Sequence, residues 1–238
     1  MGKIYFVGAG PGDPDLITVR GNDLLQKADV LVYTGSLVNP VLVDRCPAGQ
    51  KIDSWGKTLE EIVPVMIDYA REGKMVVRLH SGDPSLFGAI VEQMEMLGRE
   101  GIEYEVIPGV SSMFGAAAAL STQLTLGGVS DTLIVTRPAG ETLEEDDLPA
   151  LSDHGATLVV FLGAGRLEYV TSRVRCPPDT PAAVVYRATW PDQKIIFGTV
   201  SDIASKAKEA GIHRTALLII GGILAPGRSG HRRSQLYS

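Results

Sequence analysis

The chain has 238 residues, of which 45% are hydrophobic and 21% charged, and this balance is typical of a globular protein and excludes wholesale disorder. Its 22 Lys and Arg against 28 Asp and Glu give a net charge of −6, which disfavours general binding to nucleic acid but leaves a local basic groove open. No apolar run approaches the roughly 18 residues of a membrane span, and the two cysteines, Cys46 and Cys176, lie far apart in the sequence. We therefore expect a cytoplasmic protein with reduced thiols that contacts neither membrane nor nucleic acid.

Short apolar runs alternate with amphipathic stretches along the chain, a pattern typical of parallel α/β layers. In the first half we expect strands at 4–7, 30–33, 75–79 and 104–107, and helices at 16–28, 59–70 and 111–120. The apolar residues of the second helix recur at spacings of three and four, which places them on one face. Thr58 and Glu61 predict a capping box at its start, and Pro64 predicts a lost hydrogen bond or a kink inside it.

Strand-like runs resume in the second half of the chain. We expect strands at 132–136, 157–162, 182–186, 194–197 and 216–220, and a surface helix opened by the acidic residues 141–147. The predicted fold class is α/β with a sheet in each half. The expected organisation is an N-terminal domain at 1–115, a C-terminal domain at 116–226 and a polar, flexible tail at 227–238.

A glycine-rich turn at residues 8–14 follows the first strand and precedes a helix. A dinucleotide fingerprint would need a third glycine where Asp13 stands and an acidic residue where Thr34 or Gly35 stands. The Asp13 carboxylate would also repel a pyrophosphate at the helix N-terminus. A ligand without phosphates, or with positive charge, fits this turn better than a nucleotide.

Two further turns follow later strands, at residues 80–88 and 108–112. In an open α/β sheet, ligands bind outside the carboxyl ends of the strands, so these turns predict a composite pocket with the first. Asp13 and Asp83 also have the position of capping residues, and we expect both to cap the helices that follow them. Capping does not exclude contact with a ligand.

The segments 8–13, 78–88 and 107–112 resemble the tetrapyrrole methylases, a family that uses S-adenosylmethionine. The resemblance runs from about residue 2 to residue 224 and includes the segments 160–163, 184–189 and 215–221. Membership of this family implies two α/β domains with a cleft between them, a homodimer, and a methyl donor bound in the cleft.

Within the family, the segments 33–38, 79–85 and 187–193 are similar to the precorrin-4 C11-methyltransferases of cobalamin biosynthesis. The branch that methylates uroporphyrinogen III usually has Asp where Thr34 stands and Gly where His80 and Ser81 stand. Lys57 matches a lysine of that branch. The resemblance leaves open whether the acceptor is precorrin-4 or its cobalt-bearing counterpart.

The resemblance also implies which residues hold S-adenosylmethionine. By motif position they are Pro11, Ser81, Gly82, Asp83, Leu86, Ser111, Ser112, Leu162, Ala188, Thr215 and Ala216. Most are small or apolar, which suits recognition of the donor by backbone groups. Asp83 is the sharpest candidate because a carboxylate pairs with ribose hydroxyls or an ammonium group. Leu162 and Ala216 could equally be core residues at strand ends.

The implied acceptor is an anionic macrocycle with many carboxylates, so cations should gather near it. The candidates near strand ends are Lys57, Arg78, Arg137, Arg166 and Arg187, of which at least two are expected to be ordinary surface residues. Tyr33 and Trp190 either stack on the macrocycle or fill the core. No metal site is expected, and no nucleophile is required, because methyl transfer needs mainly alignment of the two reactants. The catalytic residue is therefore unknown, with Lys57 and His80 as candidates.

Three alternatives stay open. The chain could be another tetrapyrrole methylase, such as a uroporphyrinogen-III C-methyltransferase, although Thr34 counts against this branch. It could be a nucleotide-dependent oxidoreductase, against which the missing third glycine argues. It could also be a tetrapyrrole carrier that keeps the fold without catalysis.

Overall fold

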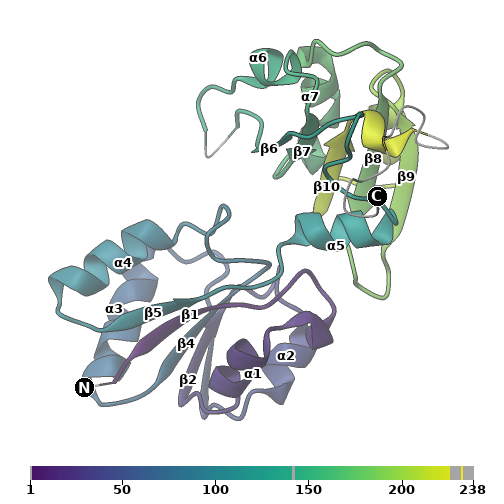
Figure 1. The fold of residues 1–238 in the computed structure, drawn as a ribbon. Coiled ribbons are helices and arrows are strands. Elements are labelled where there is room, and N and C mark those ends of the chain that lie inside the picture. Colours follow the sequence, from purple (N-terminus) through teal and green to yellow (C-terminus); the bar gives the residue numbers. More distant parts are fainter. Residues whose placement is uncertain (1, 141–142, 226–231, 233–238) are drawn as a thin grey trace. The chain divides into compact units, whose positions relative to one another are not determined.

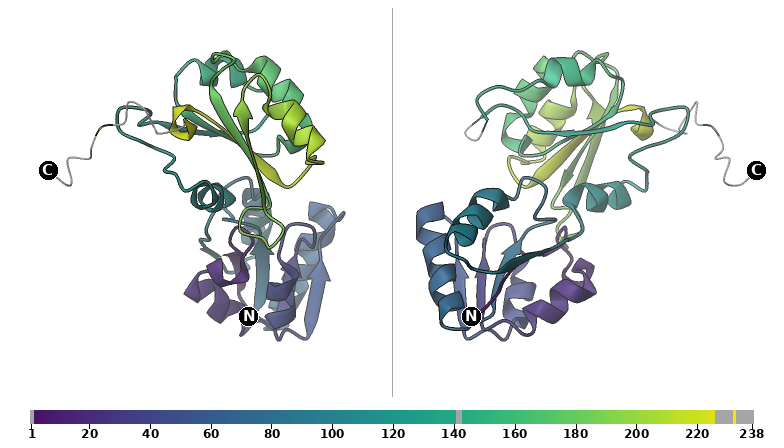
Figure 2. Two further views of the ribbon diagram at one scale, coloured as in Figure 1. Left: turned by 90° about the vertical axis from the view of Figure 1, so that its right-hand side faces the viewer. Right: turned by 60° about the vertical axis from the view of Figure 1, so that its left-hand side comes forward.

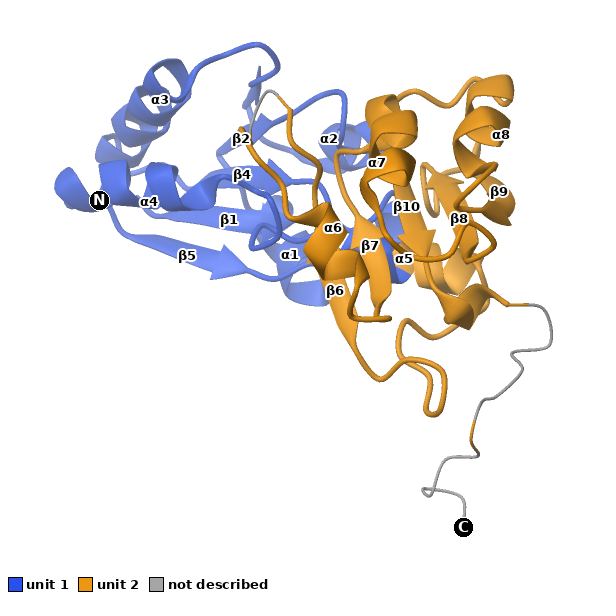
Figure 3. Ribbon diagram, turned by 90° about the horizontal axis from the view of Figure 1, so that it is seen from above, with its two compact units in different colours: residues 1–114 blue, residues 115–238 orange. Residues whose placement is uncertain are grey.

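The computed structural model describes residues 2–140, 143–225 and 232. The chain divides into two compact units, residues 1–114 and 115–238, and each contains one five-stranded sheet (Figure 3). The division falls within helix α5 (Ser112–Ala119). The predicted α/β class with one sheet in each half is thus confirmed, while the cleft stays a prediction.

The first sheet is parallel throughout, as predicted. Its strands are β1 (Ile4–Gly8), β2 (Val30–Tyr33), β3 (Gln50–Asp53), β4 (Val76–His80) and β5 (Tyr104–Ile107), in the order β3-β2-β4-β1-β5. Because parallel strands all point the same way, their carboxyl ends meet at a single edge of the sheet. The three glycine-rich turns and the turn after β3 follow strands at this edge.

Helices cover both faces of the first sheet (Figures 1 and 2). Helices α1 (Val19–Leu25) and α2 (Pro40–Arg45) pack on one face, over Leu31 and Leu79. Helices α3 (Leu59–Arg71) and α4 (Ile90–Arg99) pack on the other, over Phe6 and Val76. Large hydrophobic residues thus line both faces of the strands, with Arg78 on β4 as a buried charged exception.

Two predicted helices of the first unit differ in detail. In place of the expected helix at 16–28 the chain has a 3₁₀ turn at Pro14–Leu16 and then α1, because Ile17 ends the turn in extended conformation and Thr18 caps α1 by accepting from the Gly21 N–H at 3.1 Å. Helix α3 has the predicted capping box, in which Glu61 accepts from the Thr58 N–H at 2.8 Å. Pro64 lies inside α3 without ending it.

The second sheet is mixed, which corrects the expectation of parallel layers throughout. Its strands are β6 (Leu133–Thr136), β7 (Thr157–Val160), β8 (Pro181–Tyr186), β9 (Lys194–Thr199) and β10 (Ala216–Ile220), in the order β6-β7-β10-β8-β9. Only β6 and β7 are parallel, and β10 runs antiparallel to β7 and β8. Strands β8 and β9 form an antiparallel pair because the short connection between them leaves no room for a crossover helix.

Helices α6 (Leu148–Ser152), α7 (Leu167–Arg173) and α8 (Ile203–Glu209) pack against one face of the second sheet. The acidic residues at 141–147 were expected to open a helix, and α6 does begin directly after them, at Leu148, with Asp147 at its N-cap; the described residues 143–147 themselves are not helical. In this segment the Asp146 carboxylate accepts from the Ala139 N–H at 2.7 Å and from the Tyr169 hydroxyl at 3.0 Å. These bonds tie the segment to the turn after β6 and to helix α7. The predicted tail at 227–238, apart from Arg232, lies outside the described residues.

Candidate functional site

Three glycines bring the backbones of the first unit's turns into direct contact at the carboxyl edge of the sheet. A Cβ atom on Gly8 would lie 2.5 Å from the Gly109 Cα atom and 2.7 Å from the Gly82 carbonyl oxygen. Real Cβ atoms do not approach other atoms so closely, so a side chain at Gly8 would force the turns apart. The glycines let the ends of β1, β4 and β5 form one continuous backbone surface.

Backbone hydrogen bonds join the turns after β1 and β4. The Gly82 N–H donates to the Gly10 carbonyl at 2.8 Å, and the Gly10 N–H donates back to the Gly82 carbonyl at 3.2 Å. Both glycines have left-handed backbone, with φ of 81° and 63°, which only glycine adopts readily. This bridge places Pro11 beside the turn that carries Asp83.

Asp83 joins the turn after β4 to the turn after β5. One carboxylate oxygen accepts from the Gly109 N–H at 2.8 Å, and the other accepts from the Ser85 N–H at 2.8 Å and from the Ser85 hydroxyl. Burial alone would raise the pKa of Asp83, but these hydrogen bonds outweigh it and hold the pKa below its ordinary value. Both oxygens are thus bonded within the chain. The predicted capping by Asp13 is confirmed, because Asp13 accepts from the Asp15 N–H at the start of the 3₁₀ turn Pro14–Leu16. Asp83 holds its own turn instead, because the next helix, at Ile90–Arg99, has Ala89 at its N-cap.

The structure brings the donor-site candidates of the first unit together on these three turns. They are Pro11 after β1, Ser81, Gly82, Asp83 and Leu86 after β4, and Ser111 and Ser112 after β5. Pro11, Gly82 and Ser111 are buried, whereas Ser81 is exposed. Around these candidates the edge combines backbone groups and hydroxyls with exposed aromatic side chains, such as that of Phe87 in the turn after β4.

The remaining donor-site candidates meet at one edge of the second sheet. Leu162 follows β7, Ala188 follows β8, and Thr215 and Ala216 stand at the start of the antiparallel β10. Leu162 and Thr215 have left-handed φ of 54° each, as do Arg187 at 46° and Thr189 at 69°. Such values are costly for residues with a Cβ atom, and their gathering at one edge is typical of a functional site.

Leu162 is not a core residue, which was the alternative explanation for its position. Its side chain is 62% exposed, whereas Ala188 is buried and Ala216 is half-buried. An exposed leucine gains little from the core, so the core interpretation does not apply to Leu162. Ala216 pairs with Tyr186 in the sheet, which is consistent with the alternative that it is a core residue at a strand end.

Three of the candidate cations lie at the same edge of the second sheet. Arg137 follows β6, Arg166 ends the 3₁₀ turn at Ala164–Arg166, and Arg187 follows β8. Arg187 pairs with Asp192 at 2.6 Å and stacks on Trp190 at 4.0 Å from the ring centroid. Arg166 donates to the Ala139 carbonyl and stacks on Tyr169, so each of these two guanidinium groups is held by its neighbours.

Arg78, the fourth candidate, is buried inside the first unit, with an exposed fraction of 6%. Its Nη1 atom donates to the Ser54 hydroxyl at 2.9 Å, and the Ser54 hydroxyl lies 3.0 Å from the Thr34 hydroxyl. Burial lowers the pKa of Arg78 to about 10, while the charge of Asp53 opposes that shift. The guanidinium remains charged at neutral pH within a cluster of hydroxyl groups.

His80 lies two residues after Arg78 at the end of β4, with its ring 5.9 Å from that of Phe6. Burial, with a smaller contribution from the Arg78 charge, lowers the pKa of His80 to about 3. Its Nε2 atom is buried and has no hydrogen-bond partner among the described residues. His80 is therefore a neutral imidazole at physiological pH.

The sequence analysis missed two residues beside this cluster, Ser54 and Trp55. They begin the turn after β3, in which the Lys57 N–H donates to the Ser54 carbonyl at 3.1 Å and Lys57 itself is exposed. Trp55 is 66% exposed, which is unusual for the largest aromatic side chain. By contrast, Tyr33 packs against the core and Trp190 is half-buried, so Trp55 offers the larger open ring.

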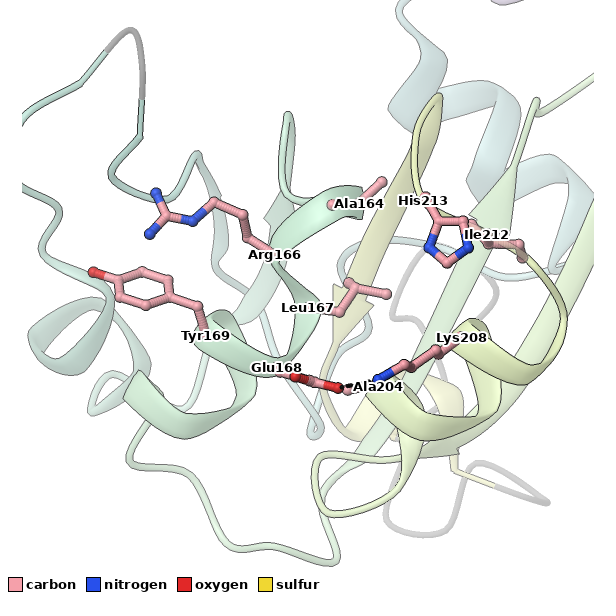
Figure 4. A pocket seen from close by; sticks show the side chains of 10 residues that line it. Ala164, Arg166, Leu167, Glu168, Tyr169, Ala204, Lys208, Ile212 and His213 are labelled. Carbon is pink, nitrogen blue, oxygen red and sulfur yellow. Dashed lines mark hydrogen bonds and ion pairs between the residues drawn. The ribbon is translucent and has the colours of Figure 1, made fainter.

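A pocket of about 350 Å³ lies within the second unit, between the start of α7 and the end of α8 (Figure 4). Glu168 and Lys208 pair across it at 3.4 Å, and Ile212 and His213 line one side. In Figure 4, Arg166 and Tyr169 extend away from Ile212 and His213. No donor-site candidate lines this pocket.

Comparison with known proteins identifies the family. A model of the tetrapyrrole (corrin/porphyrin) methylases matches residues 3–204. The chain belongs to the tetrapyrrole methylase family. It is 47% identical to the cobalt-precorrin-4 C(11)-methyltransferase of Methanocaldococcus jannaschii, over 94% of this chain and 89% of the relative. It is 44% identical to the precorrin-4 C(11)-methyltransferase of Pseudomonas aeruginosa, over 98% and 94% of the two chains.

Solved structures of tetrapyrrole methylases share the fold. An X-ray structure of a cobalt precorrin-4 methyltransferase matches with a TM-score of 0.90 and 45% identity, over 94% of this chain and 96% of that chain. The uroporphyrin-III C-methyl transferase of Thermus thermophilus, complexed with S-adenyl homocysteine, matches with a TM-score of 0.82 and 31% identity, over 94% and 99%.

As a tetrapyrrole methylase, the chain is a methyltransferase that uses S-adenosylmethionine. The described helices include none with the length and apolar character needed to span a membrane.

Proposed function

We propose that this chain transfers a methyl group from S-adenosylmethionine to C11 of precorrin-4 or of cobalt-precorrin-4. The observation that carries the proposal is the level of identity to relatives of both names, 47% and 44% over nearly the whole chain. The hydroxyl of Thr34 and the imidazole of His80 add to it, because the branch that methylates uroporphyrinogen III differs at both positions. Both residues lie at the carboxyl edge of the first sheet.

The donor would be held by the two sets of edge residues, each within its own unit. In the first unit the glycines let the three turns pack backbone against backbone, so backbone groups and the Ser81 hydroxyl stand at this edge, which fits a ligand recognised by backbone contacts. In the second unit the exposed Leu162 offers an apolar contact, and Ala188 and Thr215 stand at the ends of neighbouring strands. When bound, the donor supplies an electrophilic methyl group on a sulfonium.

The chain's own contribution to the reaction is alignment and exclusion of water. Fixing two reactants in the right geometry can supply about 7–11 kcal/mol of the barrier in favourable cases. The rigid, hydrogen-bonded turns around Gly82 and Asp83 suit this task because they do not need to reorganise. His80, held neutral, and Lys57, exposed on its turn, are the candidates for contact with the acceptor.

The acceptor carries many carboxylates, and the proposed cations are found in both units of the chain. Arg137, Arg166 and Arg187 follow strands of the second sheet, while Lys57 and Arg78 belong to the first unit. The exposed ring of Trp55 is suited to stack on a flat macrocycle. We further propose that the protein works in the cytoplasm as a homodimer, which gel filtration with light scattering would test.

The test is methylation of defined acceptors by the purified protein. With deuterated-methyl S-adenosylmethionine, mass spectrometry should show one labelled methyl group added to precorrin-4 or cobalt-precorrin-4, and NMR should place it on C11. Methylation of uroporphyrinogen III alone would overturn the branch assignment. Donor binding by calorimetry without turnover on any acceptor would favour a carrier instead.

A further inference from the structure

The Arg78 guanidinium is a buried charge with no carboxylate partner in the part of the chain that the structure describes. Its one hydrogen bond is to the neutral Ser54 hydroxyl, and its Nε atom is buried without a partner. The charge of Asp53 opposes the lowering of the Arg78 pKa, but no hydrogen bond or ion pair joins the two residues within the described chain; one Asp53 oxygen accepts from the N–H groups of Gly35 and Trp55. Buried charges in proteins are usually paired, so this arrangement calls for an explanation.

A second unpartnered polar atom lies on the same strand. The Nε2 atom of His80 is also buried without a partner, and residues two apart on a strand share a face of the sheet. The two side chains thus stand together where β4 reaches the carboxyl edge, at which ligands of open α/β sheets bind. A fixed cation beside a neutral hydrogen-bonding ring is a suitable setting for a carboxylate.

Thr34 controls the charge balance of this cluster. Its hydroxyl is 3.0 Å from the Ser54 hydroxyl, which in turn lies 2.9 Å from the Arg78 Nη1 atom and donates to the Tyr33 carbonyl at 2.9 Å. A carboxylate at position 34 would therefore be within reach of the guanidinium, directly or through Ser54. Threonine instead leaves the positive charge uncompensated.

We infer that Arg78 is kept without an internal counter-ion so that one carboxylate of the acceptor supplies it, and that Thr34 determines this specificity. The inference rests on the proposed function for the identity of the acceptor. The low polarity around a buried guanidinium strengthens its attraction for an anion, so one such cation orients a carboxylate more strongly than a solvated surface arginine. Ser54 acts as a positioning residue that holds the Nη1 end of the guanidinium.

The test compares Thr34→Asp with Thr34→Asn, which have nearly the same shape and differ in charge. Thr34→Asp should pair with Arg78, raise the melting temperature above that of Thr34→Asn, and raise the KM for cobalt-precorrin-4 by about tenfold relative to it. The kcat and the affinity for S-adenosylhomocysteine should be the same for both. Ser205→Asp, on an exposed position of α8, controls for added negative charge and should leave KM at the wild-type value.

Arg78→Gln removes the charge itself. Provided that this variant folds, it should raise the KM for cobalt-precorrin-4 as Thr34→Asp does. Binding of uroporphyrin III, a stable octacarboxylate macrocycle, is followed by quenching of tryptophan fluorescence as a readout that needs no turnover. Equal KM values and equal uroporphyrin affinities for the Asp and Asn variants would overturn the inference. A wild-type protein that methylates neither form of precorrin-4 would contradict the proposed function instead, while the uroporphyrin comparison would still decide the role of Arg78.

Discussion

At the scale of single residues, His80 shows how burial selects the chemistry that a side chain can perform. Its imidazole is held neutral because transfer into the interior disfavours the charged form and Arg78 adds a like charge. It therefore cannot act as a cation toward substrate carboxylates at physiological pH. It can donate or accept one hydrogen bond, which is a role in orientation.

The buried state of His80 predicts a specific pH dependence of stability. The pKa of His80 is lowered to about 3 in the folded chain, so between that value and its ordinary value of 6.5 the unfolded chain binds more protons. Stability is then lost as the pH falls below 6.5, by about 1 kcal/mol between pH 6.5 and 5.5 for this group. His80→Gln should lose this part of the slope in urea unfolding.

His154→Gln, at an exposed position, is the matched control and should keep the wild-type slope. The interval from pH 6.5 to 5.5 lies above the ordinary pKa values of carboxylates, so their titration contributes little to the slope. Identical slopes for His80→Gln and the wild type would mean that His80 is not buried as a neutral ring.

At the scale of elements, the Asp83 carboxylate joins the turns after β4 and β5, and the backbone bonds between Gly10 and Gly82 join the turn after β1 to them. Asp83→Ala removes the acceptor of the Gly109 N–H and the two bonds from Ser85. A hydrogen bond to a charged group contributes about 1.5–3 kcal/mol, so the turns should loosen. We expect the dissociation constant for S-adenosylhomocysteine, measured by calorimetry, to rise by about tenfold or more.

Ser85→Ala is the control for Asp83→Ala because it removes one hydroxyl donor and leaves the bond to Gly109. It should weaken donor binding much less. Comparable losses in both variants would show that the link between the turns after β4 and β5 is unimportant, and unchanged affinity in Asp83→Ala would remove Asp83 from the donor site.

The glycine turns were predictable from the sequence because their residue types have few other uses. Gly-Asp-Pro after an apolar run points to a capped turn at a strand end, and the structure has these turns at one edge. Strand β3 was missed because its residues, Gln50 to Asp53, are mostly polar, which an exposed strand at the edge of a sheet tolerates. Ser54 and Trp55 were missed for the same reason, because they stand at the edge of the sheet only if β3 precedes them.

Two features of the second unit were not predicted, and they differ in whether the sequence carries a signal for them. The antiparallel pairing of β8 and β9 follows from the short connection between Tyr186 and Lys194, a signal that was available in the spacing. The left-handed backbone at Leu162, Arg187 and Thr215 was not, because residues with a Cβ atom rarely adopt it and no local pattern announces it. Such conformations are imposed by the surrounding structure.

At the scale of the whole molecule, the proposed function depends on the distribution of charge and on two sets of donor-site candidates, one at the strand ends of each sheet. A chain of net charge −6 that acts on a polyanion should concentrate cations locally, and the arginines after β6, β7 and β8 of the second unit are the proposed ones. The donor-site candidates are divided between the units, with seven in the first and four in the second. Neither unit holds all of them.

Hydrogen–deuterium exchange with and without S-adenosylhomocysteine tests this central claim most directly, because it reports on both units in one measurement. The account predicts slower exchange at the turns 9–13, 81–86 and 109–112 of the first unit and also at residues 162–163, 187–189 and 215–216 of the second. Protection confined to one unit, or centred on the pocket between α7 and α8, would contradict it.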